Sequence, residues 1–194
     1  MTQPVMYVVG GPNGAGKTTL SVKYTTEFNA IYIGADKIAF EISPDDPAKA
    51  NVAAGRKFIE SIRRHIESGD SLVVETTLSG RGYRRLIEAA KKAGYRISIS
   101  SVFVDHADTC VARVKQRVRK GGHHVPEQDV RRRFSRSIRN FWDLYRNLAD
   151  EWYLAYNGAS GGVDVAVGEI DAFEVQDETL FSLFGQLLKD NSGE

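Results

Sequence analysis

The strongest constraint in this sequence is a glycine-rich segment that directly follows a short apolar run. Residues 5–9 (VMYVV) are apolar without alternation, which is typical of a parallel strand buried on both faces. Residues 11–18 (GPNGAGKT) fit the pattern G-x-x-x-x-G-K-[ST], and residues 18–28 have the composition of an amphipathic helix. A strand, a glycine-rich turn and a helix in this order predict a loop that binds phosphate groups.

The residue types in this loop suit the binding of a nucleoside triphosphate. Glycines let backbone N–H groups turn inward as a nest for anions, and the following helix adds the positive end of its dipole. Lys17 would reach the β- and γ-phosphates, and the hydroxyl of Thr18 would bind Mg²⁺. A glycine-rich turn that carries Lys-Thr by chance is the alternative, which the flanking strand and helix disfavour. The predicted nucleotide-binding residues are Gly11, Pro12, Asn13, Gly14, Ala15, Gly16, Lys17, Thr18 and Thr19.

Length and composition are those of one globular domain, which we expect to span residues 1–194. Hydrophobic residues make up 42% and charged residues 26%, which argues against disorder. The 26 basic and 25 acidic side chains leave a net charge of +1, so net charge indicates no polyanionic partner. Cys110 is the only cysteine, which excludes an intramolecular disulfide and a multi-cysteine metal site. Because apolar runs of about 20 residues are also absent, we expect a cytoplasmic protein without a membrane partner.

Strand-like and helical segments alternate along the rest of the chain. Short apolar runs predict strands at residues 31–33, 72–74 and 97–104. Amphipathic spacing and end signals, including Gly94 as a stop and Asp105 as a cap, predict helices at residues 48–67, 81–93, 107–119, 127–149 and 178–189. In the C-terminal part, residues 152–190, residues 152–175 are strand-like in two pieces around a hairpin turn at 158–162, before the last helix. This alternation predicts a three-layer α/β fold with a mainly parallel central sheet.

Three carboxylates follow predicted strands, at the sheet edge where ligands gather in open α/β folds. Asp36 follows the second predicted strand, where a carboxylate could accept the proton of a substrate hydroxyl; a helix cap or a turn aspartate fits this position equally well. Glu75 ends the third predicted strand and is a candidate for a position near Mg²⁺. Asp105 ends the fourth, and its spacing to Asp108 favours helix capping.

A basic stretch extends from residue 113 to residue 139. Arg113 and Arg117 are i, i+4 neighbours just before a Gly-Gly loop, which predicts a basic lid at residues 113–127 that brings guanidinium groups onto phosphates. For residues 131–133 we favour a solvated face. A groove for nucleic acid is a third interpretation, although the helical spacing of the interleaved aromatic residues favours core positions. The basic side chains are Arg113, Lys115, Arg117, Arg119, Lys120, Arg131, Arg132, Arg133, Arg136 and Arg139, and the interleaved aromatic residues are Phe134, Phe141 and Trp142.

Four segments together resemble the zeta toxin family of P-loop kinases, in particular its small stand-alone members. They are residues 10–19 (GGPNGAGKTT), 35–39 (ADKIA), 74–81 (VETTLSGR) and 117–126 (RVRKGGHHVP). The first segment is common to P-loop enzymes, whereas the ordered set of four is much more specific. The resemblance implies an ATP- and Mg²⁺-dependent kinase of UDP-N-acetylglucosamine or a related UDP-sugar, and it suggests an antitoxin protein as a partner.

The resemblance also implies roles for individual residues on the nucleotide side. Lys17 and Thr18 would handle ATP and Mg²⁺. Asp36 corresponds to the general base that acts on the sugar hydroxyl. Glu75 corresponds to an acidic residue beside the substrate, and its place at a strand end also makes it a metal-binding candidate.

On the substrate and lid side, Thr77 and Arg81 belong to the segment that corresponds to the substrate loop of the family. Arg117 corresponds to a lid arginine that contacts phosphate. The second lid arginine of the toxins, three residues before the proline, is His123 here, which we expect beside the substrate. Because a neutral imidazole cannot replace a permanent cation, either Arg119 substitutes for it or the lid is weaker.

These patterns predict in-line transfer of the γ-phosphate of ATP to a hydroxyl of a UDP-activated amino sugar. Asp36 would orient and deprotonate the hydroxyl, while Lys17 and Arg117 would neutralise the developing charge. Two alternatives remain, a P-loop kinase for another sugar or a nucleotide and a nucleic-acid-associated NTPase. The near-neutral net charge disfavours nucleic acid as a partner.

Overall fold

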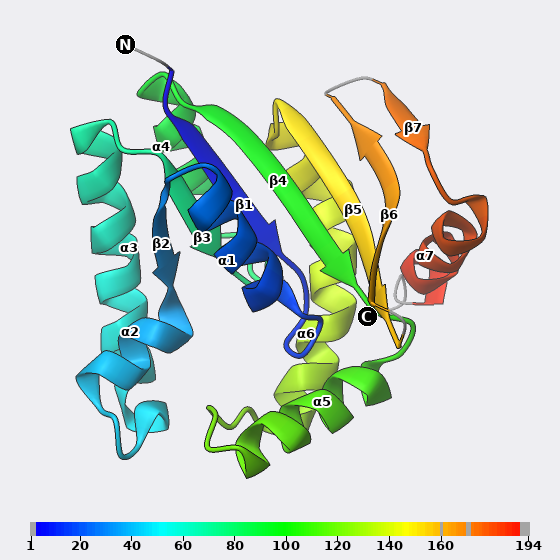
Figure 1. The fold of residues 1–194 in the computed structure, drawn as a ribbon, viewed down its shortest axis with the longest axis horizontal. Coiled ribbons are helices and arrows are strands. Elements are labelled where there is room, and N and C mark those ends of the chain that lie inside the picture. The colour runs from blue at the N-terminus through cyan, green and yellow to red at the C-terminus, as the bar shows by residue number, and fades with distance from the viewer. Residues whose placement is uncertain (1–2, 160, 170–171, 191–194) are drawn as a thin grey trace.

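The structure is a computed structural model in which residues 3–159, 161–169 and 172–190 are described. These residues form a seven-stranded sheet in the order β2-β3-β1-β4-β5-β6-β7 (Figure 1). Strands β2, β3, β1, β4 and β5 run parallel, and β6 and β7 extend one edge as antiparallel strands. The strands are β1 Val5–Gly10, β2 Ile31–Gly34, β3 Leu72–Glu75, β4 Arg96–Phe103, β5 Glu151–Gly158, β6 Gly161–Gly168 and β7 Phe173–Val175. The prediction of an α/β fold with a mainly parallel sheet is confirmed.

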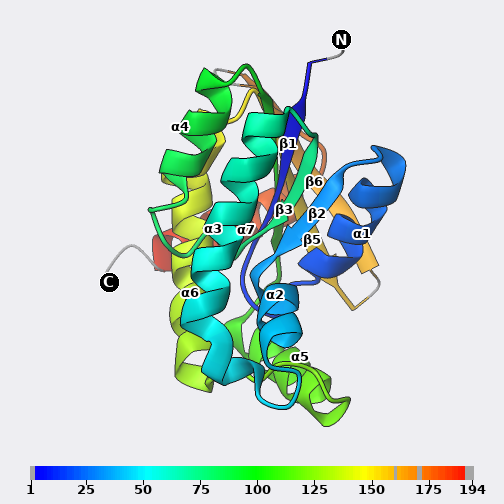
Figure 2. The same ribbon diagram turned by 90° about the vertical axis from the view of Figure 1, so that its left-hand side faces the viewer.

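Helices cover both faces of this sheet. Helix α1 lies on one face, and α3, α4, α6 and α7 lie on the other (Figure 2). Helices α2 and α5 lie at the edge where the parallel strands have their carboxyl ends (Figure 1). None of the helices combines the length and apolar character that crossing a membrane requires, within the described residues. The helices are α1 Lys17–Glu27, α2 Ala35–Ile42, α3 Asn51–Ser68, α4 Arg84–Lys92, α5 Ala107–Arg119, α6 Glu127–Asn140 and α7 Glu178–Asp190.

The segment between β2 and α3 differs from the prediction. No helix was predicted there, but α2 occupies Ala35–Ile42. It has only eight residues, of which Ile38 and Ala39 are buried, so its apolar pattern is too short to identify a helix. The helix predicted at 48–67 begins as a 3₁₀ turn, Pro47–Ala50, and becomes α-helical at Asn51.

Two of the predicted helix boundaries, Gly94 after α4 and Asp105 before α5, can be compared with the structure. Gly94 follows α4 with φ +87°, which confirms it as the left-handed stop residue. The predicted cap at Asp105 is wrong, because His106 still has an extended backbone and is itself the N-cap of α5. The Asp105 carboxylate accepts hydrogen bonds from the backbone N–H of His106 and the hydroxyl of Thr109, each at 3.0 Å.

The C-terminal half keeps the predicted order with additions. Helix α6 continues as a π-helical turn, Phe141–Tyr145, and a 3₁₀ turn, Arg146–Leu148. Strands β5 and β6 form the predicted hairpin, and the second predicted strand piece, which reached residue 175, is divided into β6 and a separate strand β7. Helix α6 is anchored by a buried stripe, Val130, Phe134 and Ile138, that packs into the main core. Phe134 and Phe141 are buried, so these two rings are not available to stack on nucleotide bases.

Strand register brings the ends of three strands together. Glu75, the last residue of β3, pairs with Val9 of β1 on one side and with Gly34 of β2 on the other. Because Val9 leads into the glycine-rich segment and Gly34 leads into α2, the carboxylate of Glu75 lies between them. This edge of the sheet therefore collects the glycine-rich segment, Glu75 and the start of α2, as the predicted strand ends imply.

Candidate phosphate-binding site

The P-loop (residues 11–18) is shaped by glycines that other residues could not replace. Gly11 has φ +133°, and a Cβ there would lie 2.1 Å from the carbonyl oxygen of Val102. Gly16 has φ +99°, and its Cβ would lie 2.2 Å from Nδ2 of Asn157. Both the backbone conformation and the lack of space exclude side chains at these positions. Glycine is thus required where the motif predicts a backbone nest for anions.

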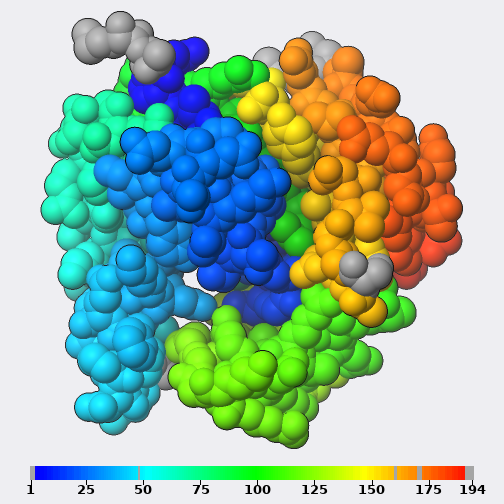
Figure 3. All heavy atoms as spheres, in the orientation of Figure 1, coloured from blue at the N-terminus to red at the C-terminus, as the bar shows by residue number. Residues whose placement is uncertain are grey.

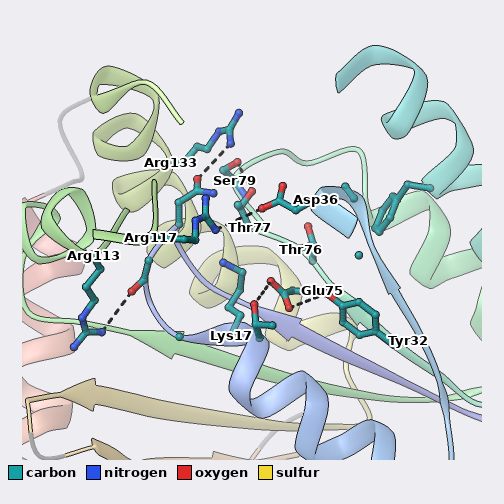
Figure 4. Close-up of a pocket in the computed structure, with 17 residues that line it drawn as sticks. Lys17, Tyr32, Asp36, Glu75, Thr76, Thr77, Ser79, Arg113, Arg117 and Arg133 are labelled. Atoms are coloured by element: carbon teal, nitrogen blue, oxygen red, sulfur yellow. Dashed lines mark hydrogen bonds and ion pairs between the residues drawn. The ribbon is translucent and has the colours of Figure 1, made fainter. Parts of the chain in front are cut away.

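Side chains from α5 and β5 hold the P-loop backbone in place. Asn157, near the end of β5, donates a hydrogen bond from Nδ2 to the carbonyl oxygen of Ala15 at 2.8 Å. Arg113 of α5 donates to the carbonyl oxygen of Asn157 at 2.9 Å and to that of Gly14 at 3.4 Å (Figure 4). The sequence predicted Arg113 in a lid over phosphates; the residue lines the cavity beside the P-loop, and its Nη1 and Nη2 donate to backbone carbonyls. Arg113 therefore supports the P-loop.

Lys17, the first residue of α1, is buried at one wall of a cavity (Figure 4). Its ammonium group donates a hydrogen bond to the carbonyl oxygen of Pro12 at 2.8 Å. Burial lowers the pKa of Lys17, and the nearby carboxylates of Glu75 and Asp36 oppose this shift. A desolvated ammonium group interacts more strongly with an anion than an exposed one does. Lys17 thus gives the P-loop a strong attraction for phosphate.

Glu75 connects α1 to β2 through its two carboxylate oxygens. Oε1 accepts a hydrogen bond from the Thr18 hydroxyl at 3.1 Å, and Oε2 accepts one from the Tyr32 hydroxyl at 3.2 Å. Burial and the Glu75 carboxylate raise the pKa of Tyr32, so its hydroxyl remains a donor. Thr18 and Glu75 present hard oxygen atoms of the kind that Mg²⁺ binds. The described residues contain no group of three or more His, Cys, Asp or Glu side chains that could hold a metal ion alone.

Asp36 lies in the first turn of α2 at the opposite wall of the cavity (Figure 4). Gly34 is the N-cap of α2, so the interpretation of Asp36 as the helix cap is wrong. Its Oδ2 lies 3.6 Å from Nη1 of Arg117. Arg117 also donates from Nη2 to the carbonyl oxygen of His123 at 2.7 Å. The buried Nε of Arg117 has no hydrogen-bond partner among the described residues, which leaves this donor for a ligand.

The P-loop, the start of α2 and a loop at residues 76–81 surround one cavity of about 470 Å³. Figure 3 shows the surface hollowed at this place, between α2 (light blue) and α5 (green), with the P-loop (dark blue) at its floor. Gly11, Pro12 and Ala15 are buried within the P-loop. The other predicted residues in the lining are Asn13, Gly14, Gly16, Lys17, Thr18, Asp36, Glu75, Thr77 and Arg117.

Besides Gly11, Pro12 and Ala15, four predicted site residues do not line this cavity. His123 lines an adjoining hollow of about 500 Å³ that shares several residues with it. Arg119 lies in a separate hollow between α5 and α6, so the structure does not bring it to the P-loop as a second lid cation. Arg81 lines a third hollow, beyond the 76–81 loop. Thr19 is exposed on α1.

Arg133 of α6 is a cavity residue that the sequence analysis missed. It lines the cavity and donates from Nη1 to Oδ1 of Asn13 at 3.3 Å (Figure 4). The expectation of a solvated face is wrong for Arg133 and correct for Arg131 and Arg132, which pair with carboxylates at the surface. Arg133 follows the buried Val130 by three positions, so it borders the buried stripe of α6. That spacing is the signal that could have found it.

The 76–81 loop is fixed by side chains of α6 and of the π-helical turn. The carbonyl oxygens of residues 77, 78 and 80 accept hydrogen bonds from Ser137, Asn140 and Tyr145, in that order. Ser137 and Asn140 are both buried, so these hydrogen bonds are shielded from water. The loop therefore has one defined conformation in which Thr77 and Ser79 line the cavity.

Fold and cavity together define a P-loop kinase-like protein, with a parallel sheet that leads into a glycine-rich anion nest and a buried lysine. The sequence model of the AAA_33 family, described as an AAA domain, matches residues 6–138. The chain belongs to this family.

Comparisons with other proteins agree with this assignment. The chain is 33% identical over 124 residues to an uncharacterized protein of Haemophilus influenzae, covering 64% of this chain and 88% of that one. The AvrRxo1-ORF1:-ORF2 structure with ATP has a TM-score of 0.75 at 17% identity, covering 96% of this chain and 64% of that chain. The PezAT toxin–antitoxin system of Streptococcus pneumoniae has a TM-score of 0.62 at 15% identity, covering 100% of this chain and 89% of that chain. Kinases are also among the solved structures that share the fold. The resemblance to zeta toxin-like P-loop kinases is thus confirmed for the fold.

Proposed function

We propose that this protein transfers the γ-phosphate of ATP to a hydroxyl of a UDP-activated amino sugar such as UDP-N-acetylglucosamine. One observation carries the proposal: the carboxylate of Asp36 and the ammonium group of Lys17 lie on the walls of one cavity. A group that accepts a proton thus faces a group that binds phosphate. This is the arrangement that phosphoryl transfer to an alcohol requires.

The donor side of the proposed reaction is built from the P-loop and two arginines. Backbone N–H groups of the P-loop and Lys17 would bind the β- and γ-phosphates. Arg117 and Arg133 line the same cavity from α5 and α6, and their planar guanidinium groups match phosphate oxygens. Arg133, rather than Arg119, therefore takes the place of a second lid cation. These cations would stabilise the charge that develops on the transferring group.

On the acceptor side, Asp36 would act as the general base. Its carboxylate would accept the proton of the sugar hydroxyl while the hydroxyl oxygen forms a bond to the γ-phosphorus. The bond between this phosphorus and the bridging oxygen of ATP would break, and ADP would leave. Arg117, 3.6 Å from Asp36, would keep the carboxylate oriented toward the cavity.

Mg²⁺ fits the donor set at the end of β3. Thr18 and Glu75 would hold it with a hydroxyl and a carboxylate oxygen, whose mutual distance is 3.1 Å. Phosphate oxygens would have to supply further ligands, because these two protein ligands are too few for a dedicated metal site. When bound, the ion neutralises charge on the β- and γ-phosphate oxygens.

The choice of a UDP-sugar as acceptor is supported by the family resemblance in four ordered segments. AvrRxo1-ORF1:-ORF2 is described as a complex, and PezAT as a toxin–antitoxin system. An antitoxin-like protein is therefore the partner that we propose for this chain as well. A cytoplasmic location would give such a kinase access to ATP and nucleotide sugars.

The test is a phosphate-sized gain in mass of the acceptor when the protein is incubated with ATP, Mg²⁺ and UDP-N-acetylglucosamine. Asp36→Asn should lower turnover by about 10²–10⁴-fold, which is the usual contribution of a general base, with nucleotide binding retained. Asp164→Asn, at an exposed residue of β6, is the matched control and should leave turnover unchanged. A panel of free sugars and nucleotides runs in parallel. Phosphorylation of one of these and not of the UDP-sugar would overturn the assignment of the acceptor.

A further inference from the structure

Tyr32 of β2 contacts the carboxylate of Glu75 and has no part in the function proposed above. Its hydroxyl donates a hydrogen bond to Oε2 of Glu75 at 3.2 Å, and Oε1 accepts one from Thr18 at 3.1 Å (Figure 4). The terminal torsion of a glutamate side chain is soft, so a carboxylate that one donor holds can still turn. Two donors on different oxygens, one from α1 and one from β2, fix its plane. Tyr32 thus completes the contacts that orient Glu75.

The absence of a side chain at Gly34 lets Tyr32 reach Glu75. Gly34 pairs with Glu75 across the two strands, and Tyr32 lies two positions earlier on the same face of β2. A Cβ at Gly34 would lie 2.3 Å from the hydroxyl oxygen of Tyr32, so the tyrosine side chain passes directly over the glycine. Gly34 itself has φ −134°, an extended conformation that any residue adopts. The tyrosine, and not the backbone, therefore requires glycine at this position.

The ring of Tyr32 is anchored, which gives its hydroxyl a defined position. The ring packs against a small buried cluster of Val9, Ala30 and Val73, while the residue also lines the main cavity. A tyrosine has only two side-chain torsions to fix, so little freedom is left once the ring is packed. Burial and then the Glu75 carboxylate raise the pKa of Tyr32, so its hydroxyl keeps the proton that it donates.

We propose that Tyr32 is a positioning residue for Mg²⁺: it occupies one oxygen of Glu75 and thereby turns the other, beside the Thr18 hydroxyl, toward the metal. This inference rests on the proposed function, in which Thr18 and Glu75 hold the ion. A neutral donor suits the task, because a lysine or arginine in its place would add a positive charge that repels Mg²⁺. Groups that hydrogen-bond to a metal ligand typically contribute about 10–100-fold to metal affinity without touching the ion.

The experiment measures nucleotide binding without an acceptor, so it does not depend on transfer. A non-hydrolysable ATP analogue is titrated by calorimetry in EDTA and at a series of Mg²⁺ concentrations. Tyr32→Phe keeps the ring and removes the hydroxyl. The Mg²⁺ concentration that half-maximally strengthens binding of the analogue should rise about tenfold, and excess Mg²⁺ should restore the wild-type affinity. The affinity in EDTA should match the wild type, because the P-loop is unaltered.

Tyr24→Phe is the matched control. It removes a tyrosine hydroxyl of α1 that is hydrogen-bonded to Ser100 at 2.9 Å, away from Glu75, and it should leave the Mg²⁺ dependence unchanged. An equal shift in Tyr24→Phe and Tyr32→Phe would overturn the proposal. Equal losses of affinity in EDTA and in Mg²⁺ for Tyr32→Phe would overturn it in favour of a packing role. An unchanged Mg²⁺ dependence in Tyr32→Phe, or wild-type binding that does not depend on Mg²⁺, would overturn it as well.

A second variant breaks the same contact without altering the tyrosine or the glutamate. Gly34→Ala places a methyl group against the Tyr32 hydroxyl and should shift the Mg²⁺ dependence in the same direction. Because both substitutions remove one hydrogen bond, the double variant should keep the shift of about tenfold seen for Tyr32→Phe alone. A double variant in which the two shifts multiply would contradict this shared cause. If the Mg²⁺ dependence shifts as expected but no acceptor gains a phosphate, the proposed reaction fails and the role of Tyr32 stands.

Discussion

The P-loop and the 76–81 loop line the same cavity but owe their shapes to different parts of the chain. The P-loop requires glycines of its own, since Gly11 and Gly16 adopt φ values of +133° and +99°, and side chains of α5 and β5 then support its backbone. The 76–81 loop is instead held at three carbonyl oxygens by side chains that lie 60, 62 and 65 positions further along the chain. The P-loop thus carries a recognisable local requirement for glycine, whereas the shape of the 76–81 loop depends mainly on tertiary contacts.

The two loops serve different substrates in the proposed reaction: the P-loop would bind ATP, and the 76–81 loop would contact the acceptor. ATP presents the same phosphate chain to every P-loop enzyme, so a local backbone structure suffices to bind it. The acceptor differs from one kinase to another, and a loop whose shape depends on a separate helix can be altered through that helix. We therefore expect substitutions in the P-loop to abolish nucleotide binding or turnover, and substitutions of the α6 side chains that hold the 76–81 loop, Ser137 and Asn140, to affect the acceptor selectively.

The largest effect is expected for Lys17→Met. Turnover should fall by about 10²–10³-fold or more, because a preorganised positive charge at the transferring phosphate is lost. Stability should not fall. Since burial lowers the pKa of Lys17, the folded state binds this proton less tightly than the unfolded state. The folded state has its full stability above the pKa of the unfolded state, where Lys17 is neutral in both states. This stability is lost as the pH falls through the lower pKa of the folded state, where the buried side chain must bind a proton.

At neutral pH the buried ammonium group of Lys17 therefore opposes folding, and methionine relieves this cost. Thermal unfolding of the wild type and of Lys17→Met at pH 7 checks the point alongside the turnover assay. A clear drop in Tm for Lys17→Met would show that Lys17 supports the fold, contrary to the separation of roles proposed for the P-loop.

The next largest effect is expected for Gly11→Ala. A Cβ at Gly11 would lie 2.1 Å from the Val102 carbonyl oxygen at φ +133°, so the P-loop must move. Strain of this kind costs about 1–3 kcal/mol, and the displaced loop should lose measurable affinity for ATP. Gly55→Ala is the control, because nothing lies within 4 Å of a Cβ at this position in α3. It should stabilise the helix by up to about 1 kcal/mol. Similar unfolding curves for the two variants would contradict the local account of the P-loop.

A smaller, metal-dependent effect is expected for Glu75→Gln. Glutamine retains an oxygen that can accept from Thr18 or Tyr32 but removes the negative charge that Mg²⁺ requires. The Mg²⁺ concentration for half-maximal turnover should rise about 10–100-fold, and added Mg²⁺ should restore activity. The control Glu88→Gln breaks an exposed ion pair with Arg84 and should leave the Mg²⁺ dependence unchanged. A loss of turnover that Mg²⁺ does not restore would assign Glu75 to the acceptor instead.

The same local–tertiary division explains how much of the fold was predictable from the sequence. The strand that became β1 and helix α5 were predicted almost to the residue, since an uninterrupted apolar run and regular spacing are local signals. Helix α2 was missed because it buries only Ile38 and Ala39. Strand β7 fell within the predicted strand-like stretch but was not recognised as a separate strand, because it has three residues, none fully buried, and pairs with β6.

The residues of the candidate site also fall into two groups, those that a local motif predicts and those whose position depends on how a helix packs. Lys17 and Thr18 follow from the motif alone, and the structure places both in the cavity. Arg133 was assigned to a solvated face because charge composition does not reveal which side of α6 packs on the sheet. Arg119 was considered as a lid cation for a related reason, since the sequence does not show that it faces away from the P-loop. Long-range placement of a helix, rather than any property of its arginines, decides which of them reach a ligand.

The smallest effect, and the most selective one, is expected for Asn140→Ala. This change removes the donor to the carbonyl oxygen of Leu78 and leaves a buried acceptor unpaired, which costs about 1–3 kcal/mol of stability. Because the 76–81 loop loses its fixed shape, the KM for the acceptor should rise while the affinity for ATP stays the same. The control Asn147→Ala removes an exposed 3.3 Å hydrogen bond seven positions further along and should change stability by less than about 0.5 kcal/mol. Equal changes in ATP affinity and in acceptor KM for Asn140→Ala would mean that α6 supports the whole cavity, and the contrast between the two loops would then fail.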